Sequence, residues 1–231
     1  MENRKHTSLK DLAQALGVSI PTVSRALKDS PEISRELCAK AKALAKEMNY
    51  RPNPFAMSLR KNAPRIIGVI VPDIVTHFFA SILNGIENMA IANGYFVIIT
   101  TSHESYEHEK RNIENLVNMR VEGIIACLSQ ETTDFSHISA LKDINMPLIL
   151  FDRVCLTDQF SSVIADGAQS AQMATQHLLD NGSKRVAFIG GANHLDIVKR
   201  RKHGYLEALR ENRIPIEKEL VVCRKIDYEE G

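Results

Sequence analysis

Arg25 is the residue of this chain whose chemistry indicates a partner most directly, because a guanidinium can donate two parallel hydrogen bonds to the edge of a guanine. It follows Ser19, whose hydroxyl can cap a helix, and Val23, which would point inward from that helix together with Leu27. The opposite face, near the helix N-terminus, suits the major groove of DNA. That outward face carries Ile20, Pro21, Ser24, Arg25 and Lys28.

A preceding helix must hold this one in place. Ser8 can cap it, and Asp11 can return the hydrogen bond as a capping box. Gly17 suits the tight turn between the two helices, where a residue with a Cβ would often be strained. Two short helices joined by a glycine are also typical of a simple αα-corner, so the motif alone leaves both interpretations open. The apolar face of the first helix consists of Leu9, Leu12, Ala13 and Leu16.

The charge distribution favours the DNA interpretation. The 231 residues have a net charge of only +1, but residues 1–64 hold twelve basic and six acidic residues, a net of +6. The remaining residues hold seventeen basic and twenty-two acidic residues, a net of −5. A basic head on an acidic body is typical of a nucleic-acid reader joined to a module that does not bind nucleic acid.

The composition is that of an ordinary globular protein, with 44% hydrophobic and 25% charged residues. The first ten residues are polar and no apolar run approaches the roughly 18 residues of a membrane span, so we expect a cytoplasmic protein without a membrane segment. The four cysteines are far apart and form no CxxC pair, which indicates reduced core thiols.

Two further helices are expected before residue 65. The first has Ser34 as its N-cap and runs to Met48, and it completes a three-helix head. The second is a helix of about two turns that starts with Asn53 as cap and Pro54 at its first position. A helix this short is marginal alone in water. Residues 51–64 are therefore either a plain linker or a hinge that folds when DNA and a second subunit are present.

From Arg65 onward, strands and helices alternate, which predicts a doubly wound α/β body. Ligands of such folds bind outside the carboxyl ends of the strands. The expected strands are 66–71, 95–101, 123–128, 147–152, 162–165, 185–190 and 220–223. The expected helices are 78–93, 108–119, 134–144, 168–181 and 199–212.

An enzymatic role finds little support. His103 and His108 lie near Glu104, Glu107 and Glu109, but their spacing fits no HExxH metal motif. The Gly190-Gly191 pair is explained by a tight turn after a strand. We therefore expect no catalytic residue, no metal and no cofactor.

Three segments together resemble the LacI/GalR family of bacterial transcription regulators. The head matches in Leu9-Lys-Asp-Leu-Ala and in Gly17-Val-Ser-Ile-Pro-Thr-Val-Ser-Arg25, and the hinge matches in Tyr50-Arg-Pro-Asn and Ala56-Met-Ser-Leu-Arg60. The body matches in Ile67-Gly-Val-Ile-Val-Pro-Asp, Phe78-Phe, Gly123-Ile-Ile, Phe151-Asp-Arg and Gly182-Ser-Lys-Arg-Val-Ala-Phe-Ile-Gly-Gly191.

The resemblance implies a repressor that binds a near-palindromic DNA operator as a homodimer. It places Ile20, Pro21 and Arg25 at base edges, and Arg25 is the candidate for a bidentate contact to guanine. Leu59 would be inserted between base steps in the minor groove. Met57 departs from the Arg common at that position. Phosphate contacts are implied for Ser8, Ser19, Thr22 and Ser24.

The resemblance also implies a two-lobed, periplasmic-binding-protein-like body that closes on a sugar-like effector. Asp73, Asp152 and Arg201 match positions that often hold polar groups of the effector. Phe78 and Phe79 could form an apolar platform, although at least one of them is expected in the core. Arg201 lies within the charge run 199–202, which is also typical of a solvated helix face, but its position three residues before Gly204-Tyr205 matches the family spacing.

The predicted domains are a helix-turn-helix head (1–50), a hinge helix and linker (51–64) and an effector-binding body (65–231), with lobes at about 65–165 and 166–231. Because the second lobe has only about two expected strands, it is expected to be incomplete at the C-terminal end. The alternatives are therefore a truncated regulator that binds DNA without a working effector site and, with less support, a solute-binding protein.

Overall fold

The computed structural model describes residues 7–50 and 65–224. The chain divides into two compact units, Met1–Asn62 and Ala63–Gly231. The expected hinge helix, with Met57 and Leu59, lies outside the described residues.

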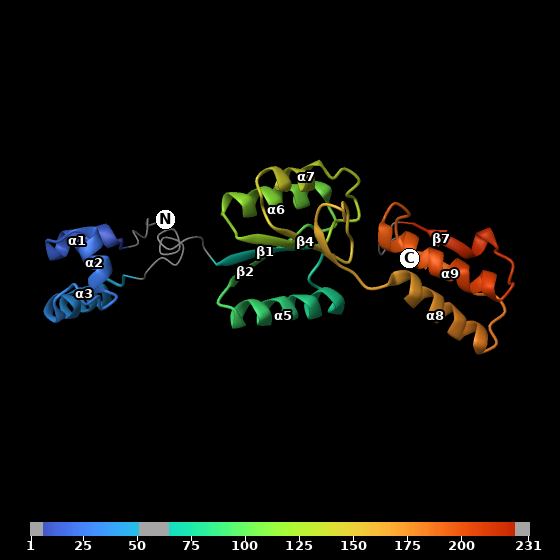
Figure 1. Ribbon diagram of the computed structural model, residues 1–231, viewed down its shortest axis with the longest axis horizontal. Coiled ribbons are helices and arrows are strands. Elements are labelled where there is room, and N and C mark those ends of the chain that lie inside the picture. The colour runs from blue at the N-terminus through green and yellow to red at the C-terminus, as the bar shows by residue number, and fades with distance from the viewer. Residues whose placement is uncertain (1–6, 51–64, 225–231) are drawn as a thin grey trace. The chain divides into compact units, whose positions relative to one another are not determined.

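Within residues 7–50, the first unit contains the three helices predicted for the head, α1 (Leu9–Leu16), α2 (Ile20–Ala26) and α3 (Arg35–Glu47) (Figure 1). The capping box of α1 is present, because Ser8 accepts from the backbone N–H of Asp11 while the Asp11 side chain accepts from the backbone N–H of Ser8. Gly17 ends α1 in the left-handed region, at φ 65°. Ser19 caps α2 and Ser34 caps α3.

The core of this unit lies where the three helices meet. Leu12 and Val23 are completely buried, and Ala13 and Ala45 lie in the same cluster. Leu9, Leu16 and Leu27 are partly buried against it, which confirms the predicted apolar faces of α1 and α2. Burial of both faces leaves the opposite side of α2 exposed to solvent.

The second unit contains a five-stranded sheet with the order β2-β1-β3-β4-β5, and every neighbouring pair is parallel. Because all five strands run the same way, their carboxyl ends share one edge. The strands are β1 (Ile66–Val71), β2 (Phe96–Thr101), β3 (Gly123–Ala126), β4 (Leu148–Phe151) and β5 (Ser161–Val163).

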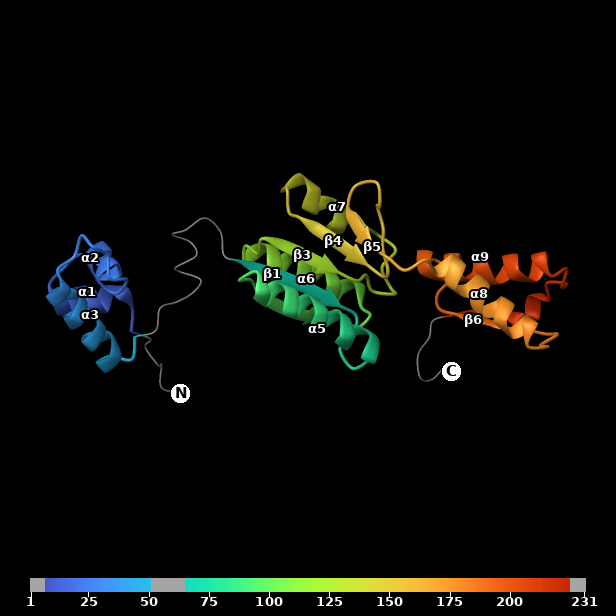
Figure 2. The ribbon, with the colours of Figure 1, turned by 60° about the horizontal axis from the view of Figure 1, so that its bottom comes forward.

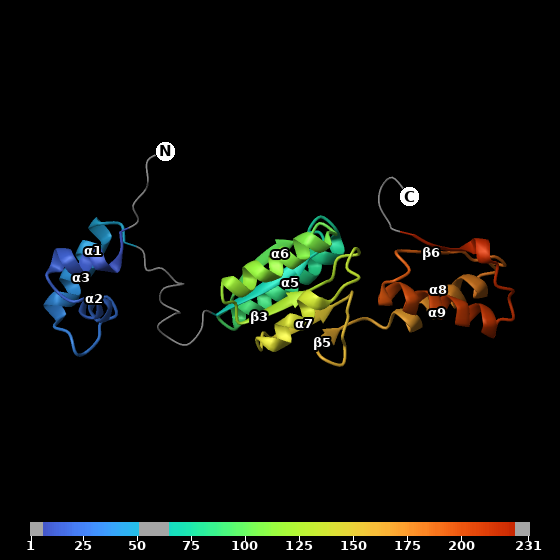
Figure 3. The same cartoon turned by 90° about the horizontal axis from the view of Figure 1, so that it is seen from above.

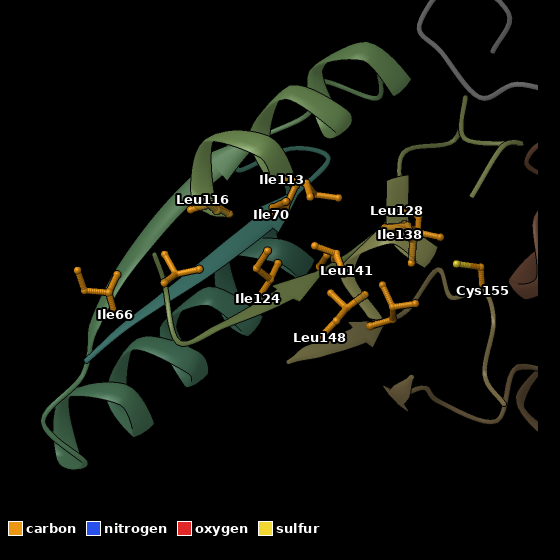
Figure 4. Packing of buried hydrophobic residues seen from close by; sticks show 13 residues of the cluster. Ile66, Ile70, Ile113, Leu116, Ile124, Leu128, Ile138, Leu141, Leu148 and Cys155 are labelled. Atoms are coloured by element: carbon orange, nitrogen blue, oxygen red, sulfur yellow. The ribbon is translucent and has the colours of Figure 1, made fainter. Parts of the chain in front are cut away.

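Helices cover both faces of this sheet. On one face lies α5 (His77–Ala92), and on the other lie α6 (Tyr106–Asn118) and α7 (Ser136–Asp143) (Figures 1 and 2). The larger core cluster joins α6 and α7 to the sheet (Figure 4). Its centre is formed by Ile70, Leu116, Ile124, Ile138 and Leu150, all essentially buried. The smaller cluster, around Val69, Phe79 and Phe151, packs under α5.

The rest of the unit is built around a helix pair. The helices α8 (Gly167–Asp180) and α9 (Asp196–Glu211) pack side by side, with a two-stranded parallel sheet beside them (Figure 3). The strands are β6 (Phe188–Gly190) and β7 (Val221–Cys223), and the one-turn 3-10 helix η1 (Lys218–Leu220) precedes β7. The fold is thus the predicted helix-turn-helix head followed by a doubly wound α/β body.

Most element boundaries of the α/β body lie within two residues of those predicted, and two differ by three residues. The strand expected at 185–190 begins only at Phe188, because β7 offers three residues for pairing and the ladder runs from Phe188 opposite Val221 to Gly190 opposite Cys223. The helix expected at 199 begins at Asp196, and Asp196 accepts a hydrogen bond from Arg200 across this first turn. Among the described helices, none has both the length and the apolar character needed to cross a membrane.

Candidate nucleic-acid interface and ligand edge

The outward face of α2 presents the residues that the sequence predicts at base edges. Ile20, Pro21 and Arg25 are exposed, while Val23 and Ala26 on the opposite side are buried. Pro21 fits the first turn because a backbone N–H at that position has no carbonyl partner within the helix, so its absence costs no helical hydrogen bond. At these three positions the face therefore presents the guanidinium donors of Arg25 and the apolar side chains of Ile20 and Pro21.

Arg25 has an ionic partner that the sequence analysis did not identify. Its Nη1 donates to Glu32 Oε2 at 2.6 Å, and Glu32 lies in the segment between α2 and α3. No helical spacing rule covers this pair, since a turn of the chain separates the two residues. Only the folded segment brings the carboxylate to the guanidinium.

The hydroxyl groups expected at phosphates lie at the N-termini of α1 and α2. Ser8 Oγ donates to Asp11 Oδ2 at 2.7 Å, and the hydroxyl groups of Ser19 and Thr22 lie 2.8 Å apart. Ser24, on the next turn, is half-buried. Three of these hydroxyl groups therefore lie near helix N-termini, where the backbone dipole also favours an anion. The fourth base contact, Leu59, lies outside the described residues.

At the carboxyl edge of the five-stranded sheet, Asp73 and Asp152 follow β1 and β4. Asp73 Oδ1 accepts from the backbone N–H of Val75 at 2.8 Å, which forms a local turn. Asp152 adopts the left-handed region, at φ 58°. Burial raises the pKa of its carboxyl group, and the positive charges of Arg153 and Arg201 oppose that rise. The charge of Arg201 thus acts on the Asp152 carboxyl group, whereas the Asp73 carboxylate accepts a hydrogen bond within its own turn.

Arg153 and Glu104 form a bidentate ion pair at the same edge, called the clamp below. Arg153 donates from Nη1 and Nη2 to the two carboxylate oxygens of Glu104, at 2.6 and 2.9 Å. Glu104 also accepts from the backbone N–H of Gln130 at 2.8 Å, and Arg153 donates to the carbonyl of Leu128. These bonds join the segments that follow β2, β3 and β4, and a bidentate pair of this kind fixes geometry.

A second carboxyl group, Glu109, is completely buried below this edge. It accepts from the backbone N–H of Ser129 at 2.5 Å and from the Thr132 hydroxyl at 2.9 Å. His137 Nε2 lies 2.8 Å from Glu109 Oε1, the oxygen that also accepts from Thr132, and the His137 side chain is only 4% exposed. Several polar partners offset the cost of burying a carboxyl group.

In the sequence, Glu104 and Glu109 stand out only as neighbours of His103 and His108. In the structure those two rings meet edge to face, with centroids 6.0 Å apart. Within residues 7–50 and 65–224, no three His, Cys, Asp or Glu side chains gather to hold a metal ion. One sequence signal indicates the burial of Glu109, because it lies four and seven residues before the buried Ile113 and Leu116 on α6.

Next to the clamp is a cavity of about 290 Å³. Its walls include Ser129, Thr132 and Arg153 on the sheet side and His194 and Lys199 near the start of α9. His194 Nε2 lies 2.8 Å from the carbonyl oxygen of Gln130. The five residues predicted to bind an effector are absent from the described lining of this cavity.

Of the two phenylalanines predicted as a platform, only Phe78 is exposed. Phe79 is 7% exposed and packs against Phe151 in the core, with ring centroids 6.4 Å apart, whereas Phe78 is 50% exposed. The two rings meet edge to face at 5.1 Å. On a helix, adjacent residues point in different directions, so one ring enters the core while the other faces solvent.

Arg201 is exposed on α9, close to the start of α8. A Cβ at Gly167 would lie 3.3 Å from Arg201 Cγ, so the stem of the arginine crosses the first residue of α8. The neighbouring Arg200 pairs instead with Asp196. The positive charge of Arg201 lowers the pKa of the Asp152 carboxyl group against the effect of burial.

Comparisons with known proteins extend across the chain. Residues 8–53 match the family model of bacterial regulatory proteins of the lacI family, and residues 65–231 match that of the periplasmic binding proteins and sugar binding domain of the LacI family. Catabolite control protein A of Priestia megaterium is 31% identical, over 98% of this chain and 68% of that protein.

Two solved structures are also similar. The lac repressor dimer bound to operator and the anti-inducer ONPF has a TM-score of 0.73 and 26% identity, over 97% of this chain and 66% of that one. A periplasmic binding protein/LacI transcriptional regulator from Alkaliphilus metalliredigens, complexed with D-xylulofuranose, has a TM-score of 0.60 and 27% identity, over 71% and 58%.

The chain therefore spans between 58 and 68% of the length of these three proteins. The two family models agree with the two parts of the structure, since one covers the three-helix head and the other covers the α/β body. This chain belongs to the LacI family of bacterial regulatory proteins.

Proposed function

We propose that the protein is a sequence-specific DNA-binding transcription regulator, acting as a repressor and as a homodimer on a near-palindromic operator. The observation that carries the proposal is the α1–turn–α2 arrangement, in which a capped α2 is held by its buried face and presents Arg25 outward. The similar lac repressor structure is a dimer bound to operator. As a regulator of chromosomal DNA the protein would act in the cytoplasm and would not be an enzyme.

In this proposal Arg25 reads a guanine, and Ile20 and Pro21 contribute apolar contacts to base edges. Ser8, Ser19, Thr22 and Ser24 contact phosphates, which position the head without reading sequence. Leu59 is inserted between base steps and kinks the duplex. Pro21 has no side-chain donor, so the hydrogen-bonded readout from α2 rests on Arg25.

The effector is proposed to be a sugar or a sugar derivative. The family model that matches the body is named for sugar binding, and one similar structure holds D-xylulofuranose. Its proposed contacts are Asp73, Phe78 and Asp152 near the carboxyl edge of the sheet and Arg201 on α9. Phe79 supports them from the core through its ring contact with Phe78.

Selection of bound duplexes from a random DNA pool tests the DNA-binding role. We expect a palindromic consensus, because a symmetric dimer presents two copies of α2. A pool that shows no enrichment after selection would contradict sequence-specific binding, and enrichment of a single unrepeated half-site would contradict the dimer.

Arg25→Ala tests the assignment of the reading helix. The substitution should cost about 1–3 kcal/mol of operator binding and relax the preference at one base pair of each half-site. Lys28→Ala is the matched control, since it removes a positive charge near Arg25 and should weaken binding to all sequences alike. An Arg25→Ala variant with unchanged sequence preference would show that α2 is misassigned.

Leu59→Ala tests the minor-groove role separately. The variant should bind the operator more weakly while its affinity for random duplex is unchanged, because only the specific complex contains the kink. An equal loss on both duplexes would contradict the role.

The effector role is tested by thermal shift against a panel of sugars and nucleobases. A stabilising sugar should lose its effect in Arg201→Ala and keep it in Arg200→Ala, which changes the neighbouring arginine paired with Asp196. A sugar whose effect survives in both variants would contradict the proposed contact.

A further inference from the structure

The guanidinium of Arg25 is paired in the protein without DNA. The Nη1–Oε2 distance to Glu32 is 2.6 Å, and the two side chains are 52% and 67% exposed. An exposed pair of this kind contributes little to stability, because water screens both charges and the two long side chains lose conformational freedom. The pair can instead act on the orientation of the Arg25 guanidinium.

The backbone of the segment that carries Glu32 is held in place. Ser30 N–H donates to the carbonyl of Arg25 itself at 3.1 Å, and Ile33 N–H donates to the carbonyl of Ser30 at 3.0 Å. Asp29 adopts φ 54° and pairs with Lys42 of α3 at 2.5 Å. The Glu32 carboxylate is thus presented to Arg25 by a segment that is tied to both α2 and α3.

This arrangement leaves donors of Arg25 available for DNA. A guanidinium has five N–H donors, and the bond to Glu32 occupies one of them at Nη1. A bidentate contact to a guanine needs two donors, so the pair with Glu32 and the contact with the base can coexist. A carboxylate beside the guanidinium also repels phosphates, which disfavours a competing contact between Arg25 and the DNA backbone.

We propose that Glu32 is a positioning residue for DNA recognition, which holds the Arg25 guanidinium in the orientation that reads a base and disfavours its use as a general phosphate contact. This inference rests on the proposed DNA-binding function. Because Glu32 carries a negative charge beside DNA, it contributes to discrimination between sequences and lowers affinity for all of them.

The test compares Glu32→Gln with Asp29→Asn. Both substitutions remove one negative charge from the same segment and keep the size of the side chain, but Asp29 pairs with Lys42 and Glu32 with Arg25. Dissociation constants are measured for the selected operator, for operators altered at each base pair, and for random duplex. The base pair that Arg25 reads is identified beforehand as the one at which Arg25→Ala loses its preference.

We expect both variants to bind random duplex more tightly than the parent chain, because each loses a repulsive charge. Only Glu32→Gln should lower the discrimination at the base pair that Arg25 reads, by about two- to five-fold, the range given by the energy of an exposed ion pair. Discrimination at the other base pairs should stay the same. Glu32→Ala should reproduce this loss, and Glu32→Asp should not restore it fully because its stem is shorter.

Equal discrimination by Glu32→Gln and the parent chain at that base pair would overturn the inference while leaving the DNA-binding function intact. So would a loss spread evenly over all base pairs or shared by Asp29→Asn, since either is the effect of charge alone. A parent chain that shows no sequence preference would overturn the proposed function and this inference with it. Circular dichroism of each variant checks that the head is folded, and Glu32 is exposed enough for all three substitutions to fit.

Discussion

At the scale of single residues, Asp152 combines a half-buried carboxyl group with a left-handed backbone, at φ 58°. Its backbone N–H donates to the carbonyl of Val163 at 3.2 Å, which holds the residue at the end of β4. Burial raises the pKa of the carboxyl group against the opposing charges of Arg153 and Arg201. A raised pKa means that the folded state disfavours the ionised form.

We expect Asp152→Asn to raise the free energy of unfolding at pH 7, because asparagine tolerates the left-handed region and carries no charge. The raised pKa means that the folded state holds the proton to a higher pH than the unfolded state. Stability of the parent chain is therefore lost as the pH rises from the unfolded to the folded pKa, and the advantage of the variant should shrink below about pH 4. Urea unfolding at several pH values measures the difference in the free energy of unfolding between the variant and the parent chain. A difference that stays the same at every pH would contradict the prediction.

The four cysteine thiols differ in their exposure to solvent. Burial raises the pKa of Cys127 and that of Cys155 to about 12, and Cys38 is buried as well, whereas Cys223 is partly exposed. Because only the thiolate reacts, a pKa near 12 lowers the reactive fraction at pH 8 on the order of a thousandfold relative to a free thiol.

Alkylation of the folded chain at pH 8 should therefore modify Cys223 first and leave Cys127 and Cys155 unmodified over the same period. Mass spectrometry of peptides identifies the modified sites, and alkylation in urea should reach all four cysteines. Cys223→Ser should remove the fast phase. Early modification of Cys127 in the folded chain would show that its site opens to solvent.

At the scale of elements, α8 and α9 approach each other closely at Gly204 of α9. A Cβ there would lie 1.9 Å from the carbonyl oxygen of Ala168 and 2.8 Å from its carbonyl carbon, on the backbone of α8. Backbone atoms cannot swing aside as a side chain can. Gly204 therefore allows the α8–α9 pair to pack at this distance, next to the buried Tyr205, whose hydroxyl donates to the carbonyl of Val186 at 2.8 Å.

Gly204→Ala should destabilise the second unit by about 1–3 kcal/mol or more, because the two helices must move apart. Gly85→Ala is the matched control, since a Cβ at Gly85 of α5 meets nothing within 4 Å. Alanine in place of a helical glycine should raise stability by about 0.4–1 kcal/mol. Chemical unfolding of both variants measures the difference, and a Gly204→Ala variant as stable as the parent would contradict the close packing.

At the scale of the whole molecule, charge is divided between the two units of the chain. Residues 1–64 carry a net charge of +6 and the remainder carries −5, although the total is only +1. A partner with many phosphates should therefore interact with the first unit and be repelled by the second. Binding of this kind releases counterions and depends on salt.

Affinity for random duplex should fall steeply as the salt concentration rises, with a slope of about −0.9 for each phosphate contacted in a plot of log affinity against log salt. Lys28→Gln should reduce the size of this slope by about 0.9, whereas Lys110→Gln, an exposed lysine on α6 of the second unit, should leave it unchanged. Fluorescence anisotropy over a salt series measures the slopes. Equal slopes for all three proteins would show that Lys28 contacts no phosphate.

Most of the fold could be predicted from the sequence because its signals are local. The caps at Ser8, Ser19 and Ser34, the turn at Gly17 and the apolar run of β1 each depend on residues a few positions apart, and the structure contains all of them. The alternation of strands and helices likewise predicted the parallel sheet. The shortened β6 could not be predicted, because its length depends on the three residues that β7 supplies from a distant part of the chain.

The sequence by itself determined the family, the three-helix head and the exposed face on which Arg25 lies. Only the tertiary structure decided that Glu32 pairs with Arg25, that Phe79 enters the core while Phe78 stays exposed, and that Arg153 clamps Glu104. The difference has one physical cause. Helix caps and hydrophobic periodicity act between near neighbours along the chain, whereas ion pairs and burial across a fold depend on which distant segments the packed core brings into contact.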